Sequence, residues 1–472
     1  MGVKISGLTA KGATIADTDL VEVSQSAGGG LYTSRSVTGA NIKALVTDAN
    51  MTTSDITTND VSTAKHGFAP KAPNDTTKFL RGDGTWAVPA AGSSSGKFGI
   101  ADSTGTYTFY TTLSLAITAA SAGQTIEFFT DYSETGNVTI TLKDGVHING
   151  NGHTYTHSYA AGNSNTFQNI SGAISCVISN LRVIRSGRAN GTTGDYVFNA
   201  TVNDSQFFFN GVFMESTYGN SVYLFGTTFQ YKPHSGDLYA KAYLTAITTQ
   251  GSITGFKGQS TSSGKGIYGL GGVIDKCTGM SISGNGIDTN GTCNNSYGFS
   301  TSAIGLGVAG TFYNCYGNST TYRAADGTAF YNCVLISSSG FAASNGQYRN
   351  CTLISASGNA AGPYLLNKHD NCYLESTSNV VVPGPYTGEF RNCTVVCLWN
   401  NAGGHAFTIG NGSIITNSHI KVENASANCI NFASAVTIKY ASNVFAGATT
   451  AVNANVTQGV SNSEDSQGNI LI

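Results

Sequence analysis

Carboxylates are the first residues to consider in this sequence, because they could catalyse hydrolysis. Breaking a glycosidic bond needs one carboxyl group as an acid and a second as a base or nucleophile, roughly 5 to 10 Å apart. Asp326, Glu375 and Glu389 are the candidate catalytic residues on this basis. A calcium-dependent lyase would need a cluster of acids, and after residue 98 adjacent acids occur only at Glu464 and Asp465.

Aromatic residues in the same stretch suit sugar binding. A flat apolar ring can pack on a sugar while its polar tip meets hydroxyl groups. The candidate glycan-binding residues are Tyr313, Tyr316, Tyr331, Tyr373 and Trp399. The alternative is that these rings pack against a neighbouring subunit or a turn of the same chain. Either use requires regularly spaced strands to carry them, and the sequence contains such a repeat.

Five segments of the chain repeat one pattern, FYNCYG, FYNCVL, YRNCTL, HDNCYL and FRNCTV. Their spacings are 18, 18, 21 and 21 residues, and the shared asparagines are Asn314, Asn332, Asn350, Asn371 and Asn392. Weaker copies surround Asn180, Asn210, Asn417 and Asn443. A period near 20 with no helical half favours a coil of short parallel strands over ankyrin or tetratricopeptide arrays. Leucine-rich repeats are the nearest alternative, but their leucine-spaced consensus is absent.

Aligning the five copies predicts which side chains point into such a coil, because side chains alternate along a strand. The inward positions are the second before each Asn, the Cys after it and the third after it. His369 falls in the first of these columns. The residue just before each Asn should point outward, which places Asp370 between Arg349 and Arg391 as a ladder of charge pairs. The Asn itself should lie where the strand turns, with stacked side-chain amides bonded to one another.

The ten cysteines are predicted to be buried free thiols. Stacked strands lie about 4.8 Å apart, whereas the Cβ atoms of a disulfide are about 3.8 Å apart. Small apolar packing is therefore the expected role of these side chains. No CxxC or CxxH spacing occurs, so we expect no metal site, and we expect no cofactor.

The composition narrows the class of protein. Of 472 residues only 11% are charged and the net charge is −2, which argues against nucleic-acid partners. The 40% apolar content argues against disorder. No apolar run is long enough for membrane insertion, and the N-terminus lacks a hydrophobic signal core. We therefore expect a protein made in the cytoplasm and not secreted.

The segment 98–472 resembles the right-handed parallel β-helix of pectate lyases. The resemblance rests on the repeated Asn-Cys turns and on an opening helix and strand, SLAITAASAGQTIEFF. In the helical part, TTLSLAITAASAGQ, Leu113, Ala116, Ile117 and Ala120 recur at helical spacing. It implies an all-β fold built as a right-handed parallel β-helix solenoid. At about 20 residues a turn, the segment would form on the order of 18 turns.

The first ninety residues resemble bacteriophage tail fibres and tailspikes. KISGLTAKG is followed by Asp19, Leu20 and alternating valines, then by a glycine turn and a second strand leading to a leucine-bearing helix. The segment HGFAPKAPNDTTKFLRGDGTWAVP is similar to a second fibre element, so its RGD at 81–83 is not taken as an adhesion motif. We expect a small virion-attachment region over 1–64, an LRGDG-type element and linker over 65–97, and a receptor-binding β-helix over 98–472.

This resemblance implies a virion protein, made in the host cytoplasm, that forms a homotrimer. Its N-terminus would dock on the phage tail, on the baseplate or on an adaptor protein, and its β-helix would attach to host cell-surface polysaccharide. The many Ser, Thr and Asn side chains suit hydrogen bonding to neutral glycans. Two alternatives stay open. One is a polysaccharide depolymerase, hydrolase or lyase, on the same β-helix, and the other is a purely structural tail or baseplate component.

Overall fold

The computed structural model is an all-β protein, 4% helical, whose chain divides into two units, Met1–Ser94 and Ser95–Ile472. It describes residues 16, 18–28, 31–45, 79–80, 86–87, 96–158, 165–169, 171–186, 196–202, 205–224, 234–307, 309–362, 367–378, 380–383, 387–400, 405–408, 410–431, 436–448, 456–458 and 470–471. In these residues no helix has the length and apolar character that a membrane span requires.

The first unit contains a hairpin followed by a helix. Strands β1 (Leu20–Gly28) and β2 (Leu31–Thr38) pair antiparallel, and α1 (Gly39–Leu45) follows directly. The Gly39 N–H donates to the Asp19 carbonyl at 2.6 Å, which ties the start of the helix to the start of the hairpin. The two strands and the helix predicted for this stretch are therefore present, while Gly29 and Gly30 of the predicted glycine turn lie outside the described residues. The KIS segment lies outside the described residues.

A second short pair lies within the LRGDG element of the same unit. Strands β3 (Phe79–Leu80) and β4 (Trp86–Ala87) pair antiparallel, with Leu80 opposite Trp86. Residues 81–83, the RGD, lie outside the described residues.

The second unit begins with an antiparallel layer and a helix. Strand β5 (Phe98–Ala101) pairs antiparallel with β6 (Tyr107–Tyr110) and with β7 (Thr125–Phe128). Helix α3 (Leu113–Ala119) starts where the Thr112 hydroxyl accepts the N–H of Leu115, a regular N-cap bond. The helix packs on β5, β6 and β9 through the predicted apolar residues Leu113, Ala116 and Ile117, all buried.

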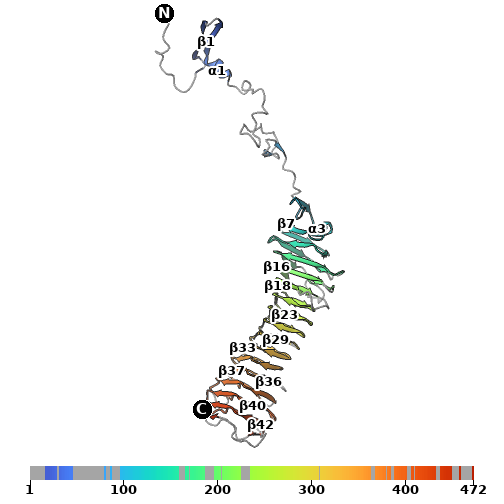
Figure 1. Cartoon of the computed structure of the whole chain (residues 1–472), viewed down its shortest axis with the longest axis vertical. Coiled ribbons are helices and arrows are strands. Elements are labelled where there is room, and N and C mark those ends of the chain that lie inside the picture. Colours follow the sequence, from blue (N-terminus) through green and yellow to red (C-terminus); the bar gives the residue numbers. More distant parts are fainter. Residues whose placement is uncertain are drawn as a thin grey trace, which may run out of the picture. The chain divides into compact units, whose positions relative to one another are not determined.

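The rest of this unit is a parallel β-solenoid of about 13 turns, and its strands stack in sequence order from β7 through β23 to β42 (Figure 1). It has three faces. The first face holds the strand before each Asn corner and the second face holds the strand after it. The third face is a separate nine-stranded sheet. The predicted parallel β-helix body is therefore confirmed.

The strands of the first face pair in parallel from β7 onward. They are β10 (His147–Asn149), β13 (Ser175–Ser179), β16 (Gln206–Ser216), β18 (His234–Ala242), β20 (Ile253–Thr254), β23 (Val273–Asp275), β26 (Thr292–Asn294), β29 (Thr311–Tyr313), β32 (Ala329–Tyr331), β34 (Gln347–Arg349), β36 (Asn367–Asp370), β38 (Gly388–Arg391), β40 (Ile414–Thr416), β42 (Val436–Ala441) and β44 (Val456–Gln458). The two longest, β16 and β18, run through the corner and also belong to the second face.

The second and third faces complete each turn. The second face holds β8 (Tyr132–Thr135), β11 (Thr154–Ser158), β14 (Arg182–Ser186), β21 (Lys257–Ser260), β24 (Thr278–Ser281), β27 (Tyr297–Ser300), β30 (Tyr316–Ser319), β33 (Val334–Ser337), β35 (Thr352–Ser355), β37 (Tyr373–Ser376), β39 (Thr394–Cys397), β41 (His419–Val422), β43 (Val444–Ala446) and β45 (Ile470–Leu471). The third face holds β9 (Ile140–Thr141), β12 (Phe167–Asn169), β15 (Phe198–Ala200), β17 (Val222–Leu224), β19 (Ile247–Thr249), β22 (Ile267–Gly269), β25 (Ile287–Thr289), β28 (Leu306–Gly307) and β31 (Ala325–Asp326).

The number of turns differs from the expected 18 or so because the turns vary in length. Equivalent residues are 30 apart between Asn149 and Ser179, 18 apart between Asn314 and Asn332, and 25 apart between Ser418 and Asn443. The repeat of 18 to 21 residues describes only the middle of the solenoid. Toward both ends of the solenoid the loops are longer, so each turn there contains more residues.

An asparagine in the left-handed backbone conformation makes the corner between the first and second faces. The five predicted corner residues have φ of 52° to 54°, which a short polar side chain tolerates. Asn332 Nδ2 donates to Asn314 Oδ1 at 3.1 Å, and Asn350 Nδ2 donates to Asn332 Oδ1 at 3.1 Å. At the end of this ladder Asn392 donates to Asp370 Oδ1 instead, at 3.2 Å. The predicted amide ladder is confirmed.

Two of the weaker copies of the repeat are out of register. Asn210 pairs with Ser179, one residue before the corner, and Gly211 with φ 62° makes the corner itself. Ser442 with φ 55° makes the corner between β42 and β43, and Asn443 follows it, buried in the cysteine column. Glycine and serine can also occupy a corner, so matching on asparagine alone shifted these copies by one residue. The other two weaker copies, Asn180 and Asn417, are corner residues as predicted.

Stacked side chains fill the interior. Phe312, Phe330, Tyr348, His369 and Phe390 form one column in which neighbouring ring centroids are 4.8 to 5.0 Å apart and ring planes lie within 8° of parallel. All five side chains are buried. The predicted inward aromatic column, with His369 in it, is confirmed.

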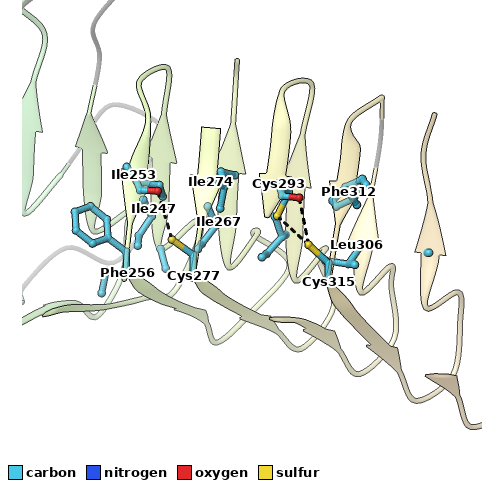
Figure 2. Packing of buried hydrophobic residues seen from close by; sticks show 14 of the residues in the cluster. Ile247, Ile253, Phe256, Ile267, Ile274, Cys277, Cys293, Leu306, Phe312 and Cys315 are labelled. Carbon is cyan, nitrogen blue, oxygen red and sulfur yellow. Dashed lines mark hydrogen bonds between the residues drawn. The ribbon is translucent and has the colours of Figure 1, made fainter. Parts of the chain in front are cut away.

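All ten cysteines are buried and free. Five of them follow the corner asparagines, as predicted. In Figure 2, Cys277 reaches the Ile253 carbonyl at 3.8 Å, and Cys315 lies 3.8 Å from Cys293. Isoleucine and leucine side chains of the third face, such as Ile267, pack toward these thiols. The thiols therefore act as small apolar filling between the faces.

A column of buried serines was not among the sequence-based predictions. Each lies five residues after a corner asparagine, and its hydroxyl donates to a loop carbonyl at 2.7 to 2.8 Å. The serines are Ser300, Ser319, Ser337, Ser355 and Ser376, and Cys397 takes the next place. The regular spacing of these serines can be read from the repeat. Their role cannot, because it depends on which loop carbonyl accepts the hydroxyl, and that contact is set by the tertiary structure.

Candidate functional site

A groove of about 330 Å³ lies on the first face of the solenoid, across β32, β34, β36 and β38. Its size falls at the lower end of the range for small-ligand sites. The lining residues are Tyr331, Gln347, Tyr348, Arg349, Lys368, His369, Asp370, Glu389 and Arg391. Most of the charged residues on these four strands therefore converge on one place, in a chain with few charges.

Strand alternation gives this groove its form. Tyr348 and His369 point into the core with 1% exposure each, so they form the floor of the groove through their backbone. The residues on either side of each point outward. One wall is the row Gln347, Lys368 and Glu389, and the other wall is the row Tyr331, Arg349, Asp370 and Arg391.

The charged groups of the groove are loosely paired. Arg349 Nε lies 3.5 Å from Asp370 Oδ2, and Lys368 Nζ lies 3.7 Å from Glu389 Oε1. Arg391 Nη2 lies 3.6 Å from Glu389 Oε2. The three cationic side chains are 51% to 63% exposed. Exposed pairs at such distances contribute about 0 to 1 kcal/mol each, so a ligand can displace them at little cost.

The predicted Arg–Asp–Arg ladder has the expected register, with Asp370 opposite both Arg349 and Arg391. Of the two predicted ion pairs, one is present. Arg349 pairs with Asp370, while Arg391 pairs with Glu389 on its own strand. The repeat predicted the outward position of the residue just before each Asn. The outward position two residues earlier, which holds Lys368 and Glu389, was not among the predictions. That second column supplies the other wall of the groove.

The aromatic candidates on the first face stack on one another. Tyr313 and Tyr331 have ring centroids 4.9 Å apart and planes 11° from parallel. On the second face, Tyr316 stacks on Tyr297 at 5.2 Å. Stacking covers one face of each ring, so that face is closed to a sugar. Of the five aromatic candidates, Tyr331 is the one that lines the groove.

The other two aromatic candidates lie away from the groove. The Tyr373 hydroxyl, on the second face, donates to Glu375 Oε2. Partial burial, together with that hydrogen bond, raises the pKa of Tyr373 to about 12. Trp399 packs partly buried against the core.

The three candidate acids lie on three different faces. Glu389 is in the groove of the first face, Glu375 is on β37 of the second face, and Asp326 is on β31 of the third face. The structure therefore does not bring any two of them together across a common groove. The carboxylate that shares the groove with Glu389 is Asp370.

Asp326 is held in a tight ion pair. Its Oδ2 lies 2.6 Å from Arg323 Nη1, and its Oδ1 accepts from Asn345 Nδ2 at 3.1 Å. Two turns earlier in the same column, Asp288 is paired with Lys265 at 2.6 Å. These partly buried pairs indicate a structural role on the third face.

Within the described residues, no group of three His, Cys, Asp or Glu side chains is placed to hold a metal ion. No protein-family model matches the chain, and neither the curated proteins nor the solved structures compared with it give a match. The conclusions about function therefore depend on the residues and their geometry.

Proposed function

We propose that this chain is a bacteriophage tail fibre or short tailspike that attaches the virion to a host cell-surface polysaccharide. The observation that carries the proposal is the order of parts along the chain. A hairpin and a leucine-bearing helix come first, an LRGDG element follows, and a parallel β-solenoid comes last. The first two parts, in this order, resemble the N-terminal parts of such fibres.

In this proposal the N-terminal region docks on the phage tail, baseplate or an adaptor protein. The solenoid assembles as a homotrimer and presents its outer faces to the cell surface. The groove on the first face supports a role in ligand binding, because charged and aromatic side chains converge there on a rigid strand platform. Three copies of one shallow groove would bind a polymeric glycan more tightly than one copy does.

Attachment without cleavage is favoured over depolymerase activity by the positions of the acids. Asp326 and Glu375 lie on other faces than Glu389, and Asp326 is already paired with Arg323. Glu389 is the one member of the three that lines the groove, and its carboxylate is paired with Lys368 and Arg391.

The experiment uses the full-length chain, fluorescently labelled, on a panel of bacterial strains. We expect binding to a subset of strains, loss of binding after periodate oxidation of surface glycans, and no loss after protease treatment of the cells. Released reducing ends and unsaturated uronate absorbance are measured in parallel, and both should stay at background.

Two results would contradict the proposal. Binding to no strain would favour a purely structural tail component. Release of sugar fragments that is lost in Asp326→Asn, Glu375→Gln or Glu389→Gln would establish the depolymerase alternative. Sedimentation of the same sample tests the trimer, because a monomer in solution would contradict that part.

A further inference from the structure

The groove on the first face carries a more specific inference, which rests on the proposed attachment function. We infer that it binds an acidic saccharide, whose carboxylate is held by Arg349, Lys368 and Arg391. Asp370 and Glu389 would accept hydrogen bonds from the hydroxyl groups of the sugar. This differs from the neutral glycan expected from composition, because composition does not show that charges gather in one groove.

The charge balance of the groove fits a single negative charge. Three cations and two carboxylates line it, which leaves one excess positive charge. A sugar carboxylate matches that excess. The carboxylates of Asp370 and Glu389 would repel a dianionic phosphate more strongly.

The geometry of the cations fits carboxylate recognition. Arg349 and Arg391 face Asp370 from the neighbouring strands on either side, so the two guanidinium groups project along one wall of the groove. Lys368 projects from the opposite wall. A guanidinium group can form two parallel hydrogen bonds to a carboxylate. The ion pairs present, at 3.5 to 3.7 Å, are longer than such charge-assisted bonds.

The remaining lining suits a sugar ring. The Tyr331 ring is stacked on Tyr313, which holds it rigidly at the end of the groove beside Arg349. The side-chain amide of Gln347 adds a neutral donor and acceptor on the other wall. The floor is strand backbone, so the site requires no ordering of a loop when a ligand binds.

The test measures binding of the full-length protein to polygalacturonate and to polysialic acid. Carboxyl-reduced polygalacturonate is the matched neutral polymer, and dextran is a second neutral control. The variants are Arg349→Gln and Arg391→Gln, both at side chains more than half exposed. The matched control is Lys421→Gln on the second face, a 47% exposed lysine paired with Glu423 at 3.0 Å.

We expect the wild type to bind at least one acidic polymer and neither neutral one. Each groove variant should bind that polymer about 10-fold or more weakly, because one charge-assisted hydrogen bond is lost. The control variant should bind as the wild type does, and all three variants should show unchanged thermal unfolding.

Binding to no acidic polymer would overturn the inference. Equal binding to the carboxyl-reduced polymer, or unchanged binding by both groove variants, would also overturn it. The bacterial panel separates this failure from failure of the attachment function. If both groove variants still bind cells in a periodate-sensitive way, the chain attaches to glycans through another surface and only the acidic-sugar inference fails.

Discussion

His369 stacks face to face on Phe390, with ring centroids 4.8 Å apart and ring planes 6° from parallel. Tyr348 covers the other face of the imidazole at 5.0 Å. Both ring nitrogens are buried, and neither has a hydrogen-bond partner among the residues that the structure describes. Burial therefore lowers the pKa of His369 to about 3, because a charged imidazole in this column would lose its hydration.

Because His369 is buried in its neutral form, we expect the stability of the solenoid to fall at acidic pH. The folded-state pKa lies below the unfolded value of 6.5, so the unfolded chain binds the proton first and stability falls as the pH drops below about 6.5. Between pH 7 and pH 5 the loss from this residue is about 2 kcal/mol. Urea unfolding at both pH values should show that His369→Phe removes a loss of this size. The exposed His419→Gln serves as a control and should not. An equal pH dependence in wild type and His369→Phe would contradict the prediction.

Two substitutions of the corner residue Asn332 should lower the free energy of unfolding by different amounts. Replacement by alanine removes two side-chain amide hydrogen bonds and leaves a Cβ at φ 54°, so we expect a loss of about 2 to 3 kcal/mol. Replacement by glycine removes the same bonds but allows the backbone conformation, and should be about 1 kcal/mol less destabilising. Denaturant titrations of both variants give the comparison. Equal losses would mean that the backbone conformation contributes nothing.

The buried thiols should be unreactive in the folded protein. Burial raises the pKa of Cys277 to about 12 and that of Cys397 to about 11. Contacts between neighbouring thiols raise the pKa of Cys333 and lower that of Cys351, but both side chains, like the other cysteines, are buried away from a reagent in solution. The reactive species is the thiolate. Titration with Ellman's reagent at pH 8 should detect almost no thiol in the native protein and all ten in denaturant. Rapid reaction of even one native thiol would show an exposed cysteine.

Asp326→Asn distinguishes a structural acid from a catalytic one. The change leaves Arg323, which is 13% exposed, without its carboxylate partner at 2.6 Å. We expect a loss of about 1 to 3 kcal/mol in unfolding free energy, in view of the partial burial. Binding to cells should be unchanged. Glu375→Gln, at an acid bonded to the Tyr373 hydroxyl, is the matched control and should cost less than about 1 kcal/mol. Unaltered stability in Asp326→Asn would contradict the structural role.

Much of the fold follows from local rules that the sequence expresses directly. A left-handed asparagine marks the corner in most of the described turns, and alternation along the strand assigns inward and outward side chains on both sides of it. That is why the column of Phe312, Phe330, Tyr348, His369 and Phe390 and the burial of the cysteines could be predicted. Where the corner residue is Gly211 or Ser442, the same reasoning was out by one residue.

The candidate site could be predicted only in part. The outward position of Asp370 followed from the repeat, but the groove needs Lys368 and Glu389 from the other wall as well. Those walls form because residues about 20 apart in the chain become neighbours across parallel strands. Which acids share a face depends on the length of every intervening loop, and loop lengths vary between turns.

The sequence by itself therefore determined a coil of parallel strands, its corners and its interior columns, because these depend on backbone conformation and strand alternation within one turn. The tertiary structure alone decided that Asp326, Glu375 and Glu389 lie on three different faces. It also decided that three cations and two carboxylates line one groove. The physical reason is that a binding surface is made by contacts between turns, and those contacts depend on how the turns are stacked in register.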